Sequence, residues 1–261
     1  MTETTSFSLK DKVVVQFGGT GLLGPALLAA LGDAGATVVA ASRSRASLEP
    51  IVAAGHAAGH DIRAEEVDTQ SEASLHALRD RILAQLGRVD GVVYNSASRP
   101  MVSFGDNLSA WKDSMATNAT GFFAAVRAFG DVMAARGSGS LVNIASQMGM
   151  IGMNPFLYEG TAMGASPDYF FHKGGMINLT RHLASHYGSK GVRVNAVSPG
   201  GIYNPSKPPP ASFLERYAKM TMLGRMAEAR ELGGAVVFLL SDASTYITGA
   251  NLAVDGGYTA K

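Results

Sequence analysis

The sequence has 261 residues, no cysteine and a formal net charge of +1. The lack of cysteine excludes disulfides, thiol catalysis and cysteine-ligated metal, and the balanced charge without a basic cluster argues against nucleic acid as a partner. Charged residues make up only 16% of the chain, below the usual ~25%. We interpret this deficit as surface buried in a homodimer or homotetramer, although large buried strands would also lower the charged fraction.

The N-terminal segment from Met1 to Lys12 is polar, and the apolar run after it spans only Val13 to Phe17. That run is too short for a signal peptide or a membrane span. We therefore expect a cytoplasmic protein that does not enter a membrane. An α/β fold of this length often forms one domain, so we expect a single domain over residues 1–261.

A glycine-rich turn follows the first predicted strand, Lys12 to Phe17, and leads into a helical pattern up to Gly35. Glycines let the backbone approach a pyrophosphate, and the helix N-terminus offers free N–H groups to it. A glycine triplet also fits an ordinary tight turn, but the strand before it and the helix after it favour a dinucleotide site. The residues expected to bind the cofactor here are Gly18, Thr20, Gly21, Leu22, Leu23 and Gly24.

The second predicted strand, Thr37 to Ser42, ends in Ser42 and Arg43. An acidic residue at this strand end would accept hydrogen bonds from the adenine-ribose hydroxyls of NAD. No carboxylate stands here to repel a 2′-phosphate, and a guanidinium can pair with one. The sequence therefore favours NADP(H), with NAD(H) and a merely solvated Arg43 as the alternatives.

Further predicted strands alternate with helices, which indicates a parallel sheet built from βαβ units. We expect one Rossmann-type, doubly wound α/β domain of about seven strands with helices on both faces. Ligands bind at the carboxyl edge of such sheets. The later strands end near residues 67, 95, 145, 197 and 255, and the groups that follow the first four of them are Asp68, Asn95-Ser96-Ala97, Ser146 and Pro199-Gly200.

Tyr169 and Lys173 follow the helix-start residues Pro167 and Asp168. Their spacing places both side chains on one face of a helix, and a positive neighbour favours the phenolate form of a tyrosine. Such pairs also arise by chance. Tyr203 and Lys207 share the spacing, but prolines within and after that copy make a helix unfavourable there (Pro205 and Pro208 to Pro210).

Taken together, these motifs resemble the short-chain dehydrogenase/reductase family from Lys12 to Tyr258. The resemblance implies that Tyr169 is the general acid/base toward the substrate oxygen and that Ser146 hydrogen-bonds the same oxygen. It further implies that Lys173 favours the phenolate form of Tyr169 and holds the nicotinamide ribose. It also gives a role to Asn118, which on its own would be a tolerated kink in a long helix capped by Asn107. The cofactor contacts it implies are Asp68, Asn95, Ser96, Ala97, Tyr169, Lys173, Pro199, Gly200 and Ile202.

The sequence departs from the family pattern at several points. Phe17 replaces the usual Thr, Leu22 stands where many members have a glycine, and Ser96 and Ser98 differ from the common Asn-Asn-Ala-Gly. The gap from Ser146 to Tyr169 is about twice as long as usual. Within it, the stretch from Tyr158 to Thr161 resembles members that act on sugars and sugar acids.

We expect three loops, 96–104, 147–168 and 203–225, to converge over the nicotinamide, the last as a mobile lid. They offer hydroxyl-binding groups, and Arg99 or Lys207 could meet a carboxylate, so we favour a sugar-like, sugar-acid or polyol substrate. Methionines at 148, 150, 153 and 163 favour the alternative of a more hydrophobic ketone. The candidate substrate residues are Arg99, Gln147, Tyr158, Glu159 and Asn204.

Two other classes of function fit parts of the pattern. A non-catalytic dinucleotide sensor could share the fold, but it would not need the set Asn118, Ser146, Tyr169 and Lys173. A sugar-nucleotide epimerase or dehydratase fits the glycine spacing, but such enzymes normally carry a larger C-terminal substrate domain. We expect an NAD(P)-dependent secondary-alcohol dehydrogenase or ketone reductase with a small-molecule substrate and no metal.

Overall fold

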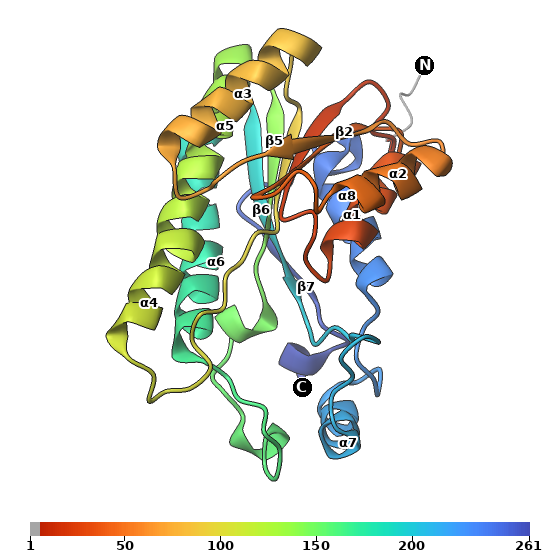
Figure 1. Cartoon of the computed structure of the whole chain (residues 1–261). Coiled ribbons are helices and arrows are strands. Elements are labelled where there is room, and N and C mark those ends of the chain that lie inside the picture. Colours follow the sequence, from red (N-terminus) through yellow and green to blue (C-terminus); the bar gives the residue numbers. More distant parts are fainter. Residues whose placement is uncertain (1–5) are drawn as a thin grey trace.

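The computed structural model describes residues 6–261; residues 1–5 of the polar N-terminal segment lie outside the described part. Seven parallel strands form one sheet in the order β3-β2-β1-β4-β5-β6-β7 (Figure 1). The predicted Rossmann-type α/β fold is thereby confirmed. The strands are β1 Val13–Phe17, β2 Thr37–Ser42, β3 Ile62–Glu66, β4 Gly91–Tyr94, β5 Gly139–Ile144, β6 Val192–Pro199 and β7 Asn251–Val254.

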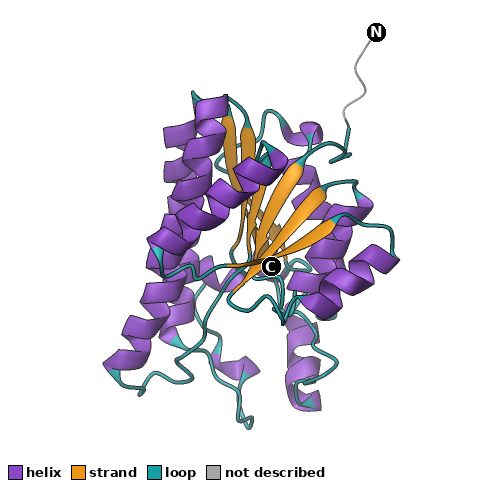
Figure 2. Ribbon diagram, turned by 45° about the horizontal axis from the view of Figure 1, so that its top comes forward, coloured by secondary structure: helices purple, strands orange, loops and turns teal. Residues whose placement is uncertain are grey.

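Helices cover both faces of the sheet (Figure 2). One face packs against α3 (Glu72–Leu86), α5 (Phe122–Arg136) and α6 (Pro167–Gly188), and the other against α1 (Gly24–Asp33) and α8 (Gly233–Leu240). Central strands therefore have no solvent-exposed face, and β1 is buried at every position. This is why β1, β2 and β4 read as largely apolar runs rather than alternating ones.

The long helix expected after Asn107 is interrupted around Asn118, where the sequence places a kink. Asn107 caps α4 (Leu108–Met115) by accepting hydrogen bonds from the backbone N–H groups of Ser109 and Ala110. A π-helical segment, Ala116–Gly121, then separates α4 from α5 and carries Asn118. Single-turn π-bulges of this kind are frequent at functional sites.

Two connections project beyond the carboxyl edge of the sheet (Figure 1). One is the long 147–166 loop, and the other contains α7 (Ala211–Met220). They share an apolar cluster in which Leu157 packs with Phe213, Tyr217 and Tyr258. The remaining helix, α2 (Glu49–Ala57), follows β2. Within residues 6–261, no helix is both long and apolar enough to cross a bilayer.

Candidate active site

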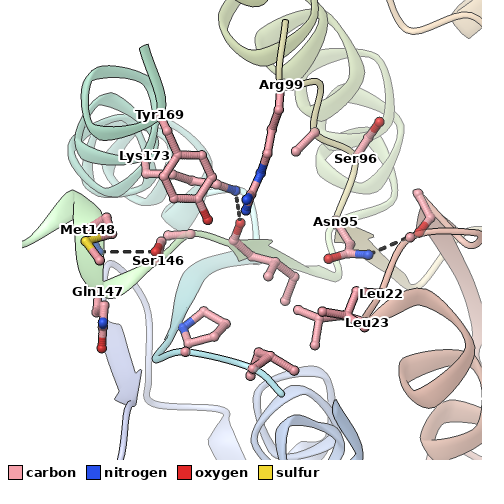
Figure 3. Close-up of a pocket in the computed structure, with 18 of the residues that line it drawn as sticks. Leu22, Leu23, Asn95, Ser96, Arg99, Ser146, Gln147, Met148, Tyr169 and Lys173 are labelled. Carbon is pink, nitrogen blue, oxygen red and sulfur yellow. Dashed lines mark hydrogen bonds between the residues drawn. The ribbon is translucent and has the colours of Figure 1, made fainter. Parts of the chain in front are cut away.

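A cavity of about 690 Å³ opens at the carboxyl edge of the sheet, within the size range of small-molecule and cofactor sites. Residues from distant parts of the sequence line it, and Figure 3 shows their side chains around the central space. The lining includes nearly all of the predicted site residues: Gly18, Thr20, Gly21, Leu22, Leu23, Ser42, Arg43, Asn95, Ser96, Ala97, Arg99, Ser146, Gln147, Tyr158, Tyr169, Lys173, Pro199, Gly200 and Ile202.

The glycine-rich turn is fixed by close backbone contacts. Gly18 has a φ of +78°, and a Cβ atom there would lie 2.8 Å from the backbone of Asn95. The Asn95 side chain donates a 3.1 Å hydrogen bond to the carbonyl of Gly18. At Gly24, where α1 begins, a Cβ atom would lie 2.2 Å from the carbonyl oxygen of Gly19. Glycine is therefore required at both ends of this turn.

That turn presents its backbone and the start of α1 to the cavity. Gly21, Leu22 and Leu23 lie on the lining, directly before the first helical residue, Gly24. A helix N-terminus favours anions, because its free N–H groups and its dipole point the same way. The residues present therefore fit the pyrophosphate of a dinucleotide, and Ser42 and Arg43 also line the cavity.

Tyr169 and Lys173 lie on the first turns of α6 and both face the cavity. Lys173 is buried, its Nζ donates a 2.6 Å hydrogen bond to the carbonyl of Ile144, and it lies 5.8 Å from the centre of the Tyr169 ring. Burial, together with the positive charge of Arg99, lowers the pKa of Lys173 to about 7. The lysine is held in place by the end of β5, and its charge responds to pH near neutrality.

Ser146 lies two residues beyond β5 and is almost fully buried. Its Oγ accepts a 3.2 Å hydrogen bond from the backbone N–H of Met148, and caps a short 3-10 turn. The hydroxyl proton remains free to donate into the cavity, where Tyr169 also points (Figure 3). Two hydrogen-bonding hydroxyls, one from the segment after β5 and one from α6, thus face one space.

Asn118 does not line the cavity but holds the wall behind it. Its Oδ1 accepts a hydrogen bond from the backbone N–H of Ser98, and its Nδ2 donates to the Ser98 carbonyl and to Ser114 Oγ. The Ser114 hydroxyl donates in turn to Asp168, the residue before Tyr169. The π-helical segment is thereby joined to the start of α6 and to the 96–99 loop.

His172 lies beside this network without taking part in it. Neither ring nitrogen has a hydrogen-bond partner in the described chain, and the side chain is buried. Its ring packs edge-on against Tyr169, with centroids 5.2 Å apart. Burial, with Lys173 adding to it, lowers the pKa of His172 to about 3, so the imidazole is neutral at physiological pH.

Some predicted residues lie away from the cavity. Asp68 is exposed and caps the turn at Gln70, and its buried neighbour Thr69 lines the cavity instead. Glu159 and Asn204 are also outside the lining, with the Glu159 carbonyl bonded to Arg216 and Asn204 bonded to Ser206. Gly24 and Asn118 lie behind the lining residues, where Gly24 permits the tight turn and Asn118 holds the 96–99 loop.

The structure adds lining residues that the sequence alone did not indicate. Ser44 and Ser47 lie near Arg43, and their only sequence signal is a run of serines after β2. Phe170 and Tyr217 also line the cavity, and the pattern of α6 and α7 alone does not distinguish a core face from a cavity face. Among the described residues, no group of three or more His, Asp or Glu side chains is placed to hold a metal.

Comparison with known proteins gives the class of this site. Residues 23–259 match the protein family described as enoyl-(acyl carrier protein) reductase. The chain is 33% identical over 253 residues to the cis-4-hydroxycyclohexanecarboxylate dehydrogenase of Sinomonas cyclohexanicum, which covers 96% of this chain and 97% of that protein. It is 31% identical over 261 residues to the D-threitol dehydrogenase of Mycolicibacterium smegmatis, covering 98% and 95%.

A solved structure agrees with these relatives. The gluconate 5-dehydrogenase from Burkholderia cenocepacia, in complex with NADP and tartrate, superimposes with a TM-score of 0.88 at 25% identity, covering 98% of both chains. The chain belongs to the short-chain dehydrogenase/reductase family. It is an NAD(P)-dependent oxidoreductase that interconverts a secondary alcohol and a ketone. The named relatives are dehydrogenases, which does not support the sensor and epimerase alternatives.

Proposed function

We propose that this protein oxidises a compact, polar secondary alcohol to a ketone, or reduces that ketone, with NADP(H) as the preferred cofactor. The observation that carries the proposal is the convergence of Tyr169, Ser146 and Lys173 on one cavity that also contains the glycine-rich turn. The bound cofactor supplies the hydride chemistry. The protein's own residues bind and orient the substrate and move a proton.

The proton chemistry follows from the positions of three groups. Tyr169 Oη accepts the proton of the alcohol in oxidation and returns it to the ketone oxygen in reduction. Ser146 Oγ donates a hydrogen bond to the same oxygen and holds it near the phenol. Lys173, fixed on the Ile144 carbonyl, places a positive charge below the ring, which stabilises the phenolate that oxidation requires. Asn118, through its hydrogen bonds to Ser98 and Ser114, holds the 96–99 loop against the start of α6.

Cofactor preference depends on the charge at the end of β2. Arg43 lines the cavity there, with Ser44 and Ser47 beside it and no Asp or Glu among the lining residues. A 2′-phosphate would gain a charge-assisted partner in Arg43 and meet no repulsion. The test is the ratio of kcat/KM with NADPH to that with NADH, which should exceed one and fall below one in Ser42→Asp.

Assembly is proposed from exposed apolar surface. Leu108, Phe123 and Phe171 are 74%, 40% and 60% exposed on α4, α5 and α6, and Phe171 packs against Trp111 on the same surface. Helices α5 and α6 cover one face of the sheet and α4 packs against α6, so a second copy docking there would bury this surface. We infer a homodimer or homotetramer, and light scattering at micromolar concentration should give at least twice the 27.1 kDa chain mass.

The decisive experiment is turnover with both cofactors and a panel of alcohols. The panel should contain polyols, sugar acids, hydroxycycloalkanes and long-chain secondary alcohols, because named relatives act on threitol, on a hydroxycyclohexane carboxylate and on gluconate. We expect turnover of polar members and weak turnover of long apolar ones. Absence of NAD(P)-dependent turnover with every alcohol and ketone would refute the proposed function.

A further inference from the structure

The cavity has an excess of positive charge. Its charged lining residues are Arg43, Arg99 and Lys173, and no lining residue is acidic. Arg43 lies at the end of β2, whereas Arg99 and Lys173 lie together at the Tyr169 end (Figure 3). Lys173 is buried, whereas Arg99 is exposed to solvent, which screens part of the repulsion between the two charges. A bound anion at the Tyr169 end would be attracted by both.

Arg99 is the cation that is free to bind this anion. Its guanidinium lies 4.4 Å from the centre of the Tyr169 ring. Among the described residues it forms no ion pair with an acidic side chain. Lys173, in contrast, already donates to the Ile144 carbonyl. A planar guanidinium with unused N–H donors matches the two oxygens of a carboxylate.

We propose that the substrate carries a carboxylate and that Arg99 binds it beside the catalytic phenol. This inference rests on the proposed function and narrows its substrate class to hydroxy acids and their keto-acid counterparts. Because Arg99 lies against the face of Tyr169, the carboxylate and the reacting carbon belong to one compact molecule. A long spacer between the two would not fit this geometry.

The remaining cavity walls indicate which kind of substrate would carry this carboxylate. Leu157, Phe170 and Phe213 line the cavity with Tyr158 and Tyr217, so the substrate end combines a single guanidinium with aromatic and aliphatic surfaces. Apolar walls with a few placed polar groups fix orientation in small-molecule sites. A short hydroxylated chain or a hydroxylated ring would fill this space, with its carboxylate at Arg99 and its hydroxyl between Ser146 and Tyr169.

The other cation expected to meet a carboxylate is elsewhere. Lys207 is exposed and does not line the cavity, and its backbone N–H bonds to the Asn204 carbonyl. Arg43 serves the opposite end of the cavity. The chain therefore provides two matched controls for Arg99, namely a second lining arginine and a second cation from the substrate loops.

The test compares paired substrates that differ only in charge. Wild-type enzyme is assayed with 4-hydroxycyclohexanecarboxylate and its neutral carboxamide, and with gluconate and its neutral amide. A charge-assisted hydrogen bond corresponds to roughly a tenfold to hundredfold difference in kcat/KM. We expect the acids to be preferred by that factor, the preference to be lost in Arg99→Gln, and part of it to return in Arg99→Lys.

The acid-to-amide ratio separates recognition from catalysis. Arg99→Gln also removes a charge next to Tyr169, which is expected to slow turnover of the acid and of its amide equally. This effect on catalysis therefore does not change the ratio of kcat/KM for acid to that for amide. Arg43→Gln and Lys207→Gln should keep the wild-type ratio, while Arg43→Gln raises the KM for NADPH.

Distinct outcomes overturn distinct statements. Equal turnover of acid and amide, or an unchanged ratio in Arg99→Gln, would overturn the carboxylate assignment and leave the dehydrogenase function intact. A weaker affinity of Arg99→Gln for NADPH with an unchanged ratio would assign Arg99 to the cofactor instead, and also overturn it. Absence of turnover with every alcohol and ketone would refute the proposed function itself.

Discussion

Two segments of this protein contain a Tyr-x-x-x-Lys pair, and they differ in almost every physical respect. Tyr169 and Lys173 lie on α6, face one cavity, and the lysine is buried against the end of β5. Tyr203 and Lys207 lie in the irregular connection before α7, both are exposed, and neither lines the cavity. Spacing in the sequence is the same in both, so spacing alone cannot confer chemistry.

The difference arises from backbone and burial. A helix holds residues i and i+4 on one face, whereas Pro205 prevents a helix at the second pair. Burial then removes water from Lys173 and makes its charge depend on the groups around it. Burial of the lysine in the first pair therefore opposes folding but places the two side chains where they can take part in proton transfer. The second pair has little effect on stability and lies outside the cavity.

The largest expected effect is a loss of kcat on substitution of the tyrosine of the first pair. Tyr169→Phe removes the proposed proton donor and keeps the ring, so kcat should fall by ~10²–10⁴-fold while NADPH binding persists. Tyr203→Phe is the matched control and should retain nearly all of the wild-type kcat. Steady-state kinetics and equilibrium cofactor binding measure both. Near-normal turnover in Tyr169→Phe would contradict the assigned role.

The next effect concerns the two lysines and has opposite signs for activity and stability. Lys173→Met should reduce kcat/KM by at least ~10²-fold yet raise the free energy of unfolding at pH 7 by roughly 2–4 kcal/mol, because burial of the lysine, which lowers its pKa, no longer opposes folding. The native pKa of Lys173 is about 7, below its unfolded value, so the unfolded chain binds more protons above pH 7. Wild-type stability gains from Lys173 as pH rises through that window, and the advantage of Lys173→Met shrinks towards pH 10.

Urea unfolding at pH 7 and pH 9.5 checks this prediction. Lys207→Met provides the control, since an exposed lysine changes stability within about 0.5 kcal/mol and should leave activity unchanged. A Lys173→Met variant that is less stable than wild type at both pH values would show that the hydrogen bond to the Ile144 carbonyl outweighs the cost of the buried charge.

Local signals were enough to predict the sheet and most of the cavity wall. Apolar runs, glycine turns and the alternation of strands with helices indicate the fold class, and polar residues at strand ends mark its carboxyl edge. Beyond the end of β3, Thr69 rather than Asp68 lines the cavity, and no local signal in the sequence decides which of two neighbours in such a loop faces inwards.

Contacts between distant segments could not be read from the sequence in the same way. Nothing local indicates that Ser114 bridges Asn118 and Asp168, or that α7 packs on the 147–158 loop. The 147–168 loop has no periodicity, so the placement of Tyr158 inside the cavity and of Glu159 outside it depends on tertiary packing. The lack of an acidic partner for Arg99 among the described residues likewise depends on how distant segments pack.

The smallest expected effect tests the residue that precedes each lysine. His172 precedes Lys173 and is buried without a hydrogen-bond partner, whereas the exposed Ser206 precedes Lys207. Lys173, Arg99 and Asp168 are the charged groups that act on the imidazole, and burial is the largest influence, holding its pKa at about 3. The native state thus resists a proton that the unfolded chain accepts below pH 6.5.

Stability should therefore fall as pH decreases from about 6.5 towards 3, by roughly 1–2 kcal/mol at pH 5 from this residue alone. His172→Phe keeps the edge-on ring contact with Tyr169 and removes the titration, so its unfolding free energy should decline less between pH 7.5 and pH 5 than that of wild type. His182→Phe, on the exposed side of the same helix, should decline as wild type does. If urea unfolding gave His172→Phe and wild type the same decline, His172 would have to gain a proton in the native state, and the unpartnered imidazole could not be the source of acid sensitivity in α6.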